Sequence, residues 1–369
     1  MTDELILHAG THKTASTYIQ ARLRRNQDLL SANQITYQFP EPDTTFKRLS
    51  KAIGKGDWSS WEHYLDHAHR PGQHLLVSAE QFGSQLTERR TIKALNRIAK
   101  QHDLKLRVVI FIRTQLDYIN SRYTYSLKRF YHTETFKQYV EDVLKGQLPS
   151  TSAFAKSLRQ RQDVFDFWAY FRELRRARRK GLSVNFLPFR QNGQDPFDQF
   201  LDFMSLPPGP QWKNCPEQAQ NRSPGIRGTF LARELGVRLK QAGIPARRIE
   251  NSSAVITAEE QFRRWDDPPF WGFSPELALR VSQHFEANNN RFAQEVWGCP
   301  WREVFPQDNA FLDRQPQVYS PSSERDRARM EAIADHLLRR LQRRLAPKPL
   351  DPLRDQAERL ISRWTRTQL

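Results

Sequence analysis

The sequence predicts an α/β protein with a central, mainly parallel sheet and helices on both of its faces. Short apolar runs typical of strands alternate with longer helical patterns, which is the order of elements found in parallel α/β folds. The strongest run, LRVVIFI at 106–112, is nearly all apolar and rich in β-branched residues. Such a run is expected for a central strand that is buried on both faces.

The other elements follow from the same patterns, and no internal repeat is present. Strands are predicted at 4–8, 75–78, 106–112 and 183–187. Helices are predicted at 14–30, 88–101, 116–131, 134–146, 163–179, 227–242 and 275–296, and a long Pro- and Gly-containing loop at 205–225. Along the first helix, the residues expected to face inward are Tyr18, Ala21, Leu29 and Leu30, and those expected to face water are Arg22, Arg24 and Arg25.

The C-terminal part of the chain differs in character, so we predict an α/β domain over 1–312 and a basic helical extension over 313–369. The extension opens with a polar linker at 313–324, followed by amphipathic helices at 323–345 and 351–366. In the first of these, Ile333, Leu337, Leu338, Leu341 and Leu345 form an apolar stripe among many arginines. We expect the extension to pack on the domain, to form an oligomer contact or to touch a membrane surface.

The net charge is +17, from 58 Lys and Arg against 41 Asp and Glu among 369 residues. This balance favours anionic partners such as nucleotides, nucleic acid, acidic glycans or a membrane face, without choosing among them. General solubility is the alternative explanation of the charge.

The two cysteines, Cys215 and Cys299, form no CxxC motif, so a zinc site or a thiol redox motif is not expected. We interpret them as free thiols in a reducing compartment. The sequence shows no signal peptide and no apolar run of 18 residues, so a cytoplasmic protein is the simplest expectation.

Residues 7–17, LHAGTHKTAST, have the pattern of a strand, a turn and the start of a helix. Gly10 allows a tight turn or a close approach to a ligand. At the helix start, residues 14–17 would present free backbone N–H groups, which bind phosphate with the help of the helix dipole. Hydroxyl groups of Thr14, Ser16 and Thr17 and the Lys13 ammonium add further donors. The alternative is a helix capped by Thr11 or Thr14, with a solvated Lys13.

This loop is not a Walker A motif, which reads G-x-x-x-x-G-K-[ST]. Here Lys13 comes three residues after Gly10, with no glycine directly before it. The strongest strand is followed by Arg113 and not by a magnesium-binding Asp. We therefore expect phosphate binding without a metal, with the fixed positive charge supplied by Lys13 and Arg113.

At these residues the sequence resembles the 5′-phosphosulfate loop of sulfotransferases, especially a bacterial group whose loop reads close to HxGxHKTGTT. The matching residues are His8, Gly10, His12, Lys13, Thr14 and Thr17. Ala15 replaces a glycine of that pattern and Ser16 replaces a threonine. The alanine requires that position 15 not adopt a positive φ.

Arg113 ends the strongest strand, and Ser121 follows it eight residues later in the next helix. Ligands of open α/β sheets bind beyond the carboxyl ends of strands, where a guanidinium can hold a phosphate through two hydrogen bonds. The alternative is an Arg113 paired with Asp117 and an ordinary helical serine. The segment resembles the motif with which sulfotransferases hold the 3′-phosphate of their donor, although Thr114-Gln115 departs from the usual Asp-Pro.

Weaker resemblances extend the match to about residues 4–297. Residues 186–190 and 197–201 are similar to a late strand and helix of the family, and 285–292 to its closing helix. Asn221-Arg222-Ser223 resembles a late loop that lies near the nucleotide, which makes Arg222 and Ser223 further candidates for donor binding.

The resemblance implies a P-loop-like sulfotransferase fold and an enzyme that moves a sulfuryl group from 3′-phosphoadenosine-5′-phosphosulfate (PAPS) to a hydroxyl or amine. The product is adenosine 3′,5′-bisphosphate (PAP), and no metal is required. Donor binding is expected from Gly10, Thr11, His12, Lys13, Thr14, Ala15, Ser16, Thr17, Arg113, Ser121, Arg222 and Ser223. Lys13 would stabilise the leaving phosphate.

The first choice for the catalytic base is Glu80, which follows the strand at 75–78 and would be kept ionised by Lys13. His12 is the second choice, because imidazole titrates near neutral pH. His8 is expected to be structural. The alternative for Glu80 is a helix cap or a pair with a surface arginine.

The acceptor is expected to be a glycan or another anionic molecule. The aromatic segment 265–273 could stack on sugars or belong to the core, and 172–180 is interpreted as a solvated helix face. Two alternative functions are a P-loop kinase that uses ATP and magnesium, and a non-catalytic basic protein that binds nucleic acid or anionic lipid. The sequence has no zinc-finger, RNP or helix-turn-helix signature, so nucleic acid is not an expected partner.

Overall fold

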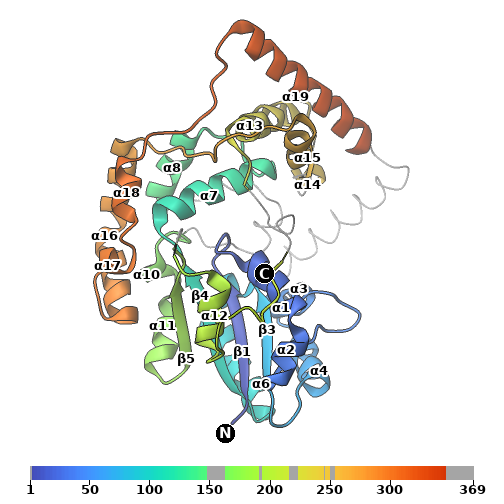
Figure 1. Ribbon diagram of the computed structural model, residues 1–369, viewed down its shortest axis with the longest axis vertical. Helices are drawn as coiled ribbons and strands as arrows, with labels where there is room; N and C mark the ends of the chain where they lie inside the picture. Colours follow the sequence, from blue (N-terminus) through green and yellow to red (C-terminus); the bar gives the residue numbers. More distant parts are fainter. Residues whose placement is uncertain are drawn as a thin grey trace, which may run out of the picture.

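The computed structural model of the chain describes residues 2–147, 163–190, 193–215, 223–244, 246–249 and 254–345. Its centre is a five-stranded, all-parallel sheet with the strand order β2-β3-β1-β4-β5 (Figure 1). The strands are β1 (Glu4–Gly10), β2 (Ile35–Thr36), β3 (His74–Ala79), β4 (Lys105–Ile112) and β5 (Ser183–Pro188). The predicted α/β class with a mainly parallel sheet is confirmed.

The two central strands, β1 and β4, are the most deeply buried part of the sheet. Leu5 and Leu7 in β1 and Val108 to Ile112 in β4 have no exposed surface. The register places Gly10, the last residue of β1, beside Phe111 near the end of β4. Both strands therefore end at the same level, so the loops that follow them start side by side.

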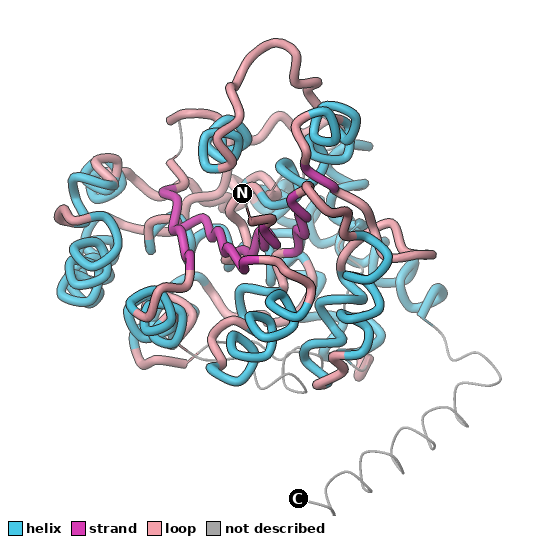
Figure 2. Tube along the Cα trace, turned by 90° about the horizontal axis from the view of Figure 1, so that it is seen from below, coloured by secondary structure: helices cyan, strands magenta, loops and turns pink. Residues whose placement is uncertain are grey.

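Helices lie on both sides of the sheet, as Figure 2 shows from below. The helices α1 (Ser16–Arg25) and α2 (Gln27–Ala32) connect β1 to β2, and α1 packs against α12 (Pro196–Phe203). The helix α6 (Arg89–Gln101) packs on β4 and against α11 (Arg172–Arg179), which in turn packs on β5. Between β2 and β4 the chain also forms α3 (Lys47–Lys55), α4 (Ser59–Ala68) and α5 (Phe82–Gln85).

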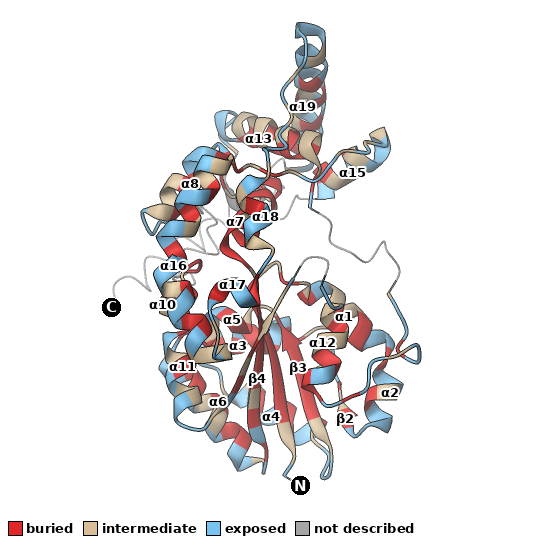
Figure 3. Cartoon of the chain, turned by 60° about the vertical axis from the view of Figure 1, so that its left-hand side comes forward, coloured by how far each residue is buried: buried red, intermediate tan, exposed pale blue. Residues whose placement is uncertain are grey.

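A second group of helices lies beyond the carboxyl edge of the sheet (Figure 1). It contains α7 (Gln115–Lys128), α8 (Phe136–Leu144), α13 (Ile226–Gln241), α14 (Ala246–Ile249), α15 (Ala254–Arg263) and α18 (Asp308–Asp313). The long helix α16 (Pro275–Trp297) runs from this group down beside β5, where Trp297 donates to the Phe186 carbonyl at 2.8 Å. The short helices α10 (Phe167–Tyr170) and α17 (Trp301–Val304) pack against α16. Buried residues concentrate in the strands and on the helix faces that turn inward (Figure 3).

The helix α19 (Glu324–Leu345) packs against α13. Its expected apolar stripe is present, with Ile333, Leu337 and Leu341 buried and Leu338 and Leu345 half-buried. Arg238 of α13 donates a hydrogen bond to Asp335 at 2.7 Å. The chain that leads to α19 also pairs with the domain, since Gln317 and Trp271 form an antiparallel bridge. The helix expected at 351–366 lies outside the described residues.

The first predicted helix, 14–30, is wrong in two respects. It starts at Ser16, and it is divided at Asn26, whose side chain bonds the Arg22 carbonyl at 2.7 Å and the Lys213 carbonyl at 2.9 Å. Arg22 was expected to face water but is buried. Its guanidinium lies 4.1 Å from the centre of the Phe197 ring, so the apolar stem and the planar head are covered by α12.

Both cysteines, Cys215 and Cys299, are free. Among the described residues, no group of three or more His, Cys, Asp or Glu side chains is arranged to hold a metal ion. Within the same residues, no helix is long and apolar enough to cross a lipid bilayer.

Candidate anion-binding site at the carboxyl edge of the sheet

A cavity of about 770 Å³ opens at the carboxyl edge of the sheet, where β1, β3 and β4 end. This is the edge at which open α/β sheets bind ligands, and the volume is within the range of cofactor pockets. The candidate residues that line it are His12, Lys13, Ala15, Ser16, Thr17, Glu80, Arg113, Ser121 and Ser223. The structure therefore brings most of the sequence candidates into one site.

The remaining candidates of the first loop shape it without lining the cavity. Thr11 Oγ1 donates to the Phe111 carbonyl of β4 at 3.0 Å, and Thr14 Oγ1 donates to the Thr11 carbonyl at 2.6 Å. Both hydroxyl groups are buried in these bonds. A Cβ atom on Gly10 would lie 2.9 Å from Ser16 Oγ, so glycine is needed there for the loop to pass the helix start so closely.

The loop contains two residues in the left-handed region, Lys13 with φ 71° and Ala15 with φ 57°. The expectation that Ala15 would avoid a positive φ is therefore wrong. Ala15 is the N-cap of α1, and the loop before it is held in place by the bonds of Thr11 to the Phe111 carbonyl and of Arg113 to the Lys13 carbonyl. Loops of this kind are typical of anion-binding nests, and an alanine in the left-handed region costs about 1–2 kcal/mol.

Ala15→Gly should therefore raise the free energy of unfolding by about 1 kcal/mol, because glycine adopts the left-handed region without strain. Urea unfolding followed by circular dichroism measures this change. The matched control is Ala21→Gly in the middle of α1, which should lower the free energy of unfolding by about 1 kcal/mol. A destabilised Ala15→Gly protein would contradict the backbone conformation described above.

The start of α1 supplies unpaired donors to the cavity. Ser16 and Thr17 are its first two residues, and their backbone N–H groups have no partner within the helix. The Ser16 hydroxyl is buried and has no hydrogen-bond partner among the described residues. A buried, unsatisfied hydroxyl costs about 1–3 kcal/mol, so a ligand with acceptor oxygens would be favoured there.

Lys13 extends along the cavity with its Nζ 5.1 Å from the centre of the Tyr125 ring. Burial lowers the pKa of Lys13 to about 8, and the charges of Lys128, Arg113 and Arg129 act in the same direction, while Glu80 opposes them. An ammonium crowded by other cations binds a multiply charged anion strongly, because the anion relieves the mutual repulsion.

Arg113 joins the two candidate motifs. Its Nη1 donates to the Lys13 carbonyl at 2.6 Å, and its Nε contacts the Asp117 carboxylate. The pairing with Asp117 that the sequence left as an alternative is present, but it does not remove Arg113 from the cavity wall. Ser121, one turn further along α7, lines the same cavity. Lys13 and Arg113 thus belong to one site.

The side chains of Glu80 and His12 lie next to each other in the cavity wall. Glu80 directly follows β3, and its Oε1 lies 3.4 Å from His12 Nδ1. Burial alone would raise the pKa of Glu80, but the neighbouring His12, Lys13 and Lys47 lower it to about 2. Glu80 is therefore a carboxylate at every physiological pH.

His8 is part of the core and not of the cavity, as expected. It lies in β1, where its Nδ1 is 2.7 Å from Ser78 Oγ and its ring packs on Phe111 and Phe200. Burial lowers its pKa to about 4, while the charge of Glu80 acts in the opposite direction. The imidazole is neutral and structural.

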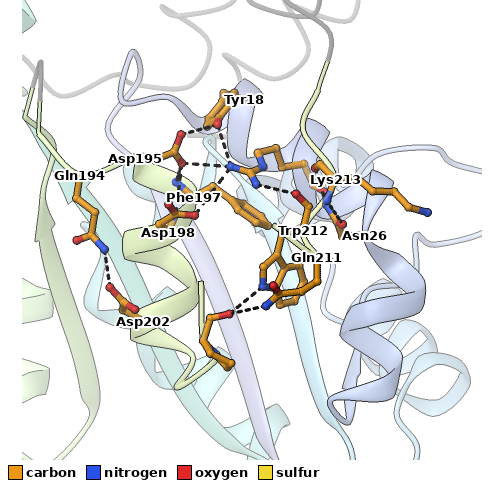
Figure 4. Close-up of polar contacts among 12 residues, drawn as sticks. Tyr18, Asn26, Gln194, Asp195, Phe197, Asp198, Asp202, Gln211, Trp212 and Lys213 are labelled. Atoms are coloured by element: carbon orange, nitrogen blue, oxygen red, sulfur yellow. Dashed lines mark hydrogen bonds and ion pairs between the residues drawn. The ribbon is translucent and has the colours of Figure 1, made fainter. Parts of the chain in front are cut away.

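A polar network joins α1 to the start of α12 beside the cavity, and Figure 4 shows its residues Tyr18, Asp195 and Trp212. Tyr18 donates to Asp195 at 2.6 Å, and both side chains line the cavity. Arg22 donates to the Tyr18 hydroxyl at 3.1 Å and to the Trp212 carbonyl at 3.2 Å, and lies 3.5 Å from Asp195. This network fixes α1 to the start of α12.

Several cavity residues were missed by the sequence interpretation. They are Tyr18, Thr45, Lys47, Tyr125, Arg129, Phe189, Arg190 and Asp195. Tyr125 and Arg129 could have been found, because they lie four and eight residues after Ser121 and so share its face of α7. The others come from loops or helix starts, whose position depends on distant parts of the chain.

One candidate for donor binding, Arg222, falls outside the described residues. In the aromatic segment 265–273, Trp271 and Phe273 are buried in the core, and neither lines the cavity. This arrangement agrees with the structural alternative for those two side chains.

The cavity wall carries two groups of potential anion ligands, the Lys13 loop and Arg113 with Ser121, and a carboxylate–imidazole pair near Lys13. Such a site can hold a molecule with two phosphoryl groups and can take a proton near one of them. No protein-family model matches the chain, and no curated protein sequence matches it. The function is therefore inferred from the site.

Proposed function

We propose that this protein is a sulfotransferase that moves a sulfuryl group from PAPS to a hydroxyl or amine group of an acceptor. The observation that supports it most is the single cavity lined by both Lys13 and Arg113, with Arg113 Nη1 bonded to the Lys13 carbonyl at 2.6 Å. One nucleotide with phosphoryl groups at its 5′ and 3′ ends would be held by these two cations. The strand order, with the loop following the central strand β1, fits the P-loop-like fold expected of such an enzyme.

The residues of the cavity fit the donor. Lys13, the N–H groups of Ser16 and Thr17, and the unpaired Ser16 hydroxyl would hold the 5′-phosphosulfate. Arg113 and Ser121 would hold the 3′-phosphate. The volume of about 770 Å³ leaves room for an acceptor next to the nucleotide.

When bound, the donor supplies the sulfuryl group, whose bond to the 5′-phosphate breaks as a bond to the acceptor oxygen or nitrogen forms. Lys13 stabilises the negative charge that develops on the departing phosphate. Of the two candidate bases, His12 takes the acceptor proton, because the contact of its Nδ1 with Glu80 Oε1 at 3.4 Å leaves Nε2 for the acceptor. Glu80 orients the His12 ring, in the way a carboxylate supports a catalytic histidine.

Three further cations, Lys47, Arg129 and Arg190, line the cavity around this pair. The carboxylates that line it are Glu80 and Asp195. This excess of positive charge supports an anionic acceptor such as an acidic glycan. A screen of acceptors with radiolabelled donor would identify it.

The proposal is tested by calorimetry with PAP and with ATP–magnesium. We expect PAP to bind more tightly, and its affinity to be unchanged when a chelator removes divalent cations. A preference for ATP–magnesium would reject the proposal in favour of a kinase.

The affinity for PAP should fall as the pH rises through about 8. Lys13 must be charged to bind the phosphate, and its pKa in the ligand-free protein is about 8. The proton is therefore present below pH 8 and lost above it, so the dissociation constant should rise by up to about tenfold per pH unit above that value. Calorimetry at several pH values measures the rise, and Lys13→Ala should remove it. An unchanged affinity up to pH 9.5 would contradict the role of Lys13.

Glu80→Gln should lower turnover by about 100-fold and leave the affinity for PAP nearly unchanged, because it removes the charge that supports His12. His12→Asn should give a loss of at least the same size. Turnover and PAP affinity are measured on the same preparations, with Glu62→Gln, an exposed glutamate of α4 outside the cavity, as the matched control. A fully active Glu80→Gln protein would remove Glu80 from the mechanism.

A further inference from the structure

A second groove, of about 350 Å³, runs between α6 and α11 and is separate from the cavity at the carboxyl edge. Its floor is aliphatic, formed by the buried Ile92 and the half-buried Ala177. Its rim carries five exposed cations, Arg89 and Lys93 from α6 and Arg176, Arg179 and Lys180 from the end of α11. The single acidic residue that lines it is Glu173.

Some of the cations on the rim form no ion pair with an acidic side chain among the described residues. Glu173 is already paired with Arg176 at 2.9 Å, and Arg179 with Glu295 at 2.9 Å. Arg89, Lys93 and Lys180 form no ion pair within the part of the chain that the structure describes.

The basic rim also continues beyond the groove. Arg97 and Lys100 extend the row of exposed cations along α6, four and seven residues after Lys93. Neighbouring side chains at this helical spacing are about 5–6 Å apart, so the row presents regularly spaced positive charges to one linear partner.

We propose that this groove binds a linear acidic polysaccharide. Its sulfate or carboxylate groups would be held by the cations of the rim, since the guanidinium fork matches both groups. The C–H faces of its sugar rings would lie on the aliphatic floor. The proposal rests on the groove alone and holds whether or not the protein transfers sulfuryl groups.

The composition of the groove favours this partner over other polyanions. No aromatic side chain lines it, so it lacks the stacking platform that single-stranded nucleic acid uses. The large apolar residues most exposed among the described ones, Phe262, Leu279 and Val318, lie elsewhere, so the groove has no anchor for a membrane. Apart from Glu173 its polar side chains are donors, which would leave the N–H groups of an acidic peptide without acceptors.

The test is a titration of the full-length protein with a heparin octasaccharide, a polyglutamate peptide and a 12-nucleotide single-stranded DNA. The double variant Lys93→Glu/Lys180→Glu reverses two unpaired charges of the rim. Its matched control, Arg325→Glu/Arg329→Glu, reverses two exposed charges on α19 and gives the same net charge. PAP is titrated against each protein to follow the other cavity.

We expect the octasaccharide to bind the unchanged protein most tightly of the three probes. The groove variant should lose about tenfold or more of this affinity, while the control loses about twofold. The PAP affinity of all three proteins should stay the same. Equal losses in the two variants, tighter binding of the DNA or the peptide, or displacement of the octasaccharide by PAP would each overturn the proposal.

Discussion

The Lys13→Ala protein should turn over about a thousand times more slowly than the unchanged protein, since removal of one preorganised donor to a developing charge has an effect of this size. Lys13 lies in the loop that leads into α1, where burial and the cations around it lower its pKa to about 8. The electrostatic attraction between the Lys13 ammonium and the departing phosphate should therefore be strongest in the transition state, when negative charge develops on that phosphate. Transfer of radiolabelled sulfate to an acceptor measures the loss.

The control for this experiment is Lys51→Ala, which removes an exposed lysine of α3 that does not line the cavity. Position 13 lies in the left-handed region with φ 71°, and alanine is no more strained there than lysine. The fold should therefore be retained, which circular dichroism checks. Turnover within a few fold of the unchanged protein would exclude Lys13 from the chemical step.

The second large effect is expected from Arg113→Ala, which should weaken PAP binding by about 2–4 kcal/mol. The guanidinium is held in place by the Lys13 carbonyl and by Asp117, so it meets a phosphate without having to be reoriented. Its removal would leave the 3′-phosphate without its main partner. Calorimetry with purified protein gives the change directly.

Adenosine 5′-monophosphate, which lacks the 3′-phosphate, separates two explanations of this loss. If Arg113 binds the 3′-phosphate, the substitution should weaken PAP far more than the monophosphate, as in a double-mutant cycle. Equal losses for both nucleotides would mean that Arg113 acts only by holding the Lys13 loop, and would contradict the proposed 3′-phosphate site.

The strands that form the sheet interior were predictable from sequence because burial on both faces leaves a continuous apolar run. All four predicted strands are present, with β4 at Lys105–Ile112 against the expected 106–112. The edge strand β2 escaped prediction, since its two residues, Ile35 and Thr36, carry no periodic signal. Long helices with clear caps were also found, and α16 at Pro275–Trp297 matches the expected 275–296 closely.

The errors arise where distant contacts override local preference. Arginine is usually exposed to solvent, yet Phe197 and Trp212, which are distant from Arg22 in the sequence, cover its side chain. Asn26 ends α1 because its amide pairs with the backbone of Lys213. Ala15 adopts a conformation that its residue type disfavours, because the loop is anchored on both sides.

The two motifs of the candidate site could be predicted from the sequence, but the other residues that line the cavity could not. The Lys13 loop and Arg113 each follow a strong strand, and parallel strands bring their carboxyl ends to one edge. The sequence could not show that the Thr14 hydroxyl is occupied by the Thr11 carbonyl, nor that His12 meets Glu80. These depend on loop geometry that no residue pattern specifies.

The loop after β1 is fastened to β4 twice, by Thr11 to the carbonyl of Phe111 and by Arg113 to the carbonyl of Lys13. The entropy cost of ordering the loop is therefore met when the chain folds and does not reduce the free energy of nucleotide binding. Nucleotide binding should then be fast and occur in one step, without a slow rearrangement of the loop. Substitutions in the loop should change the dissociation rate constant of the nucleotide far more than its association rate constant.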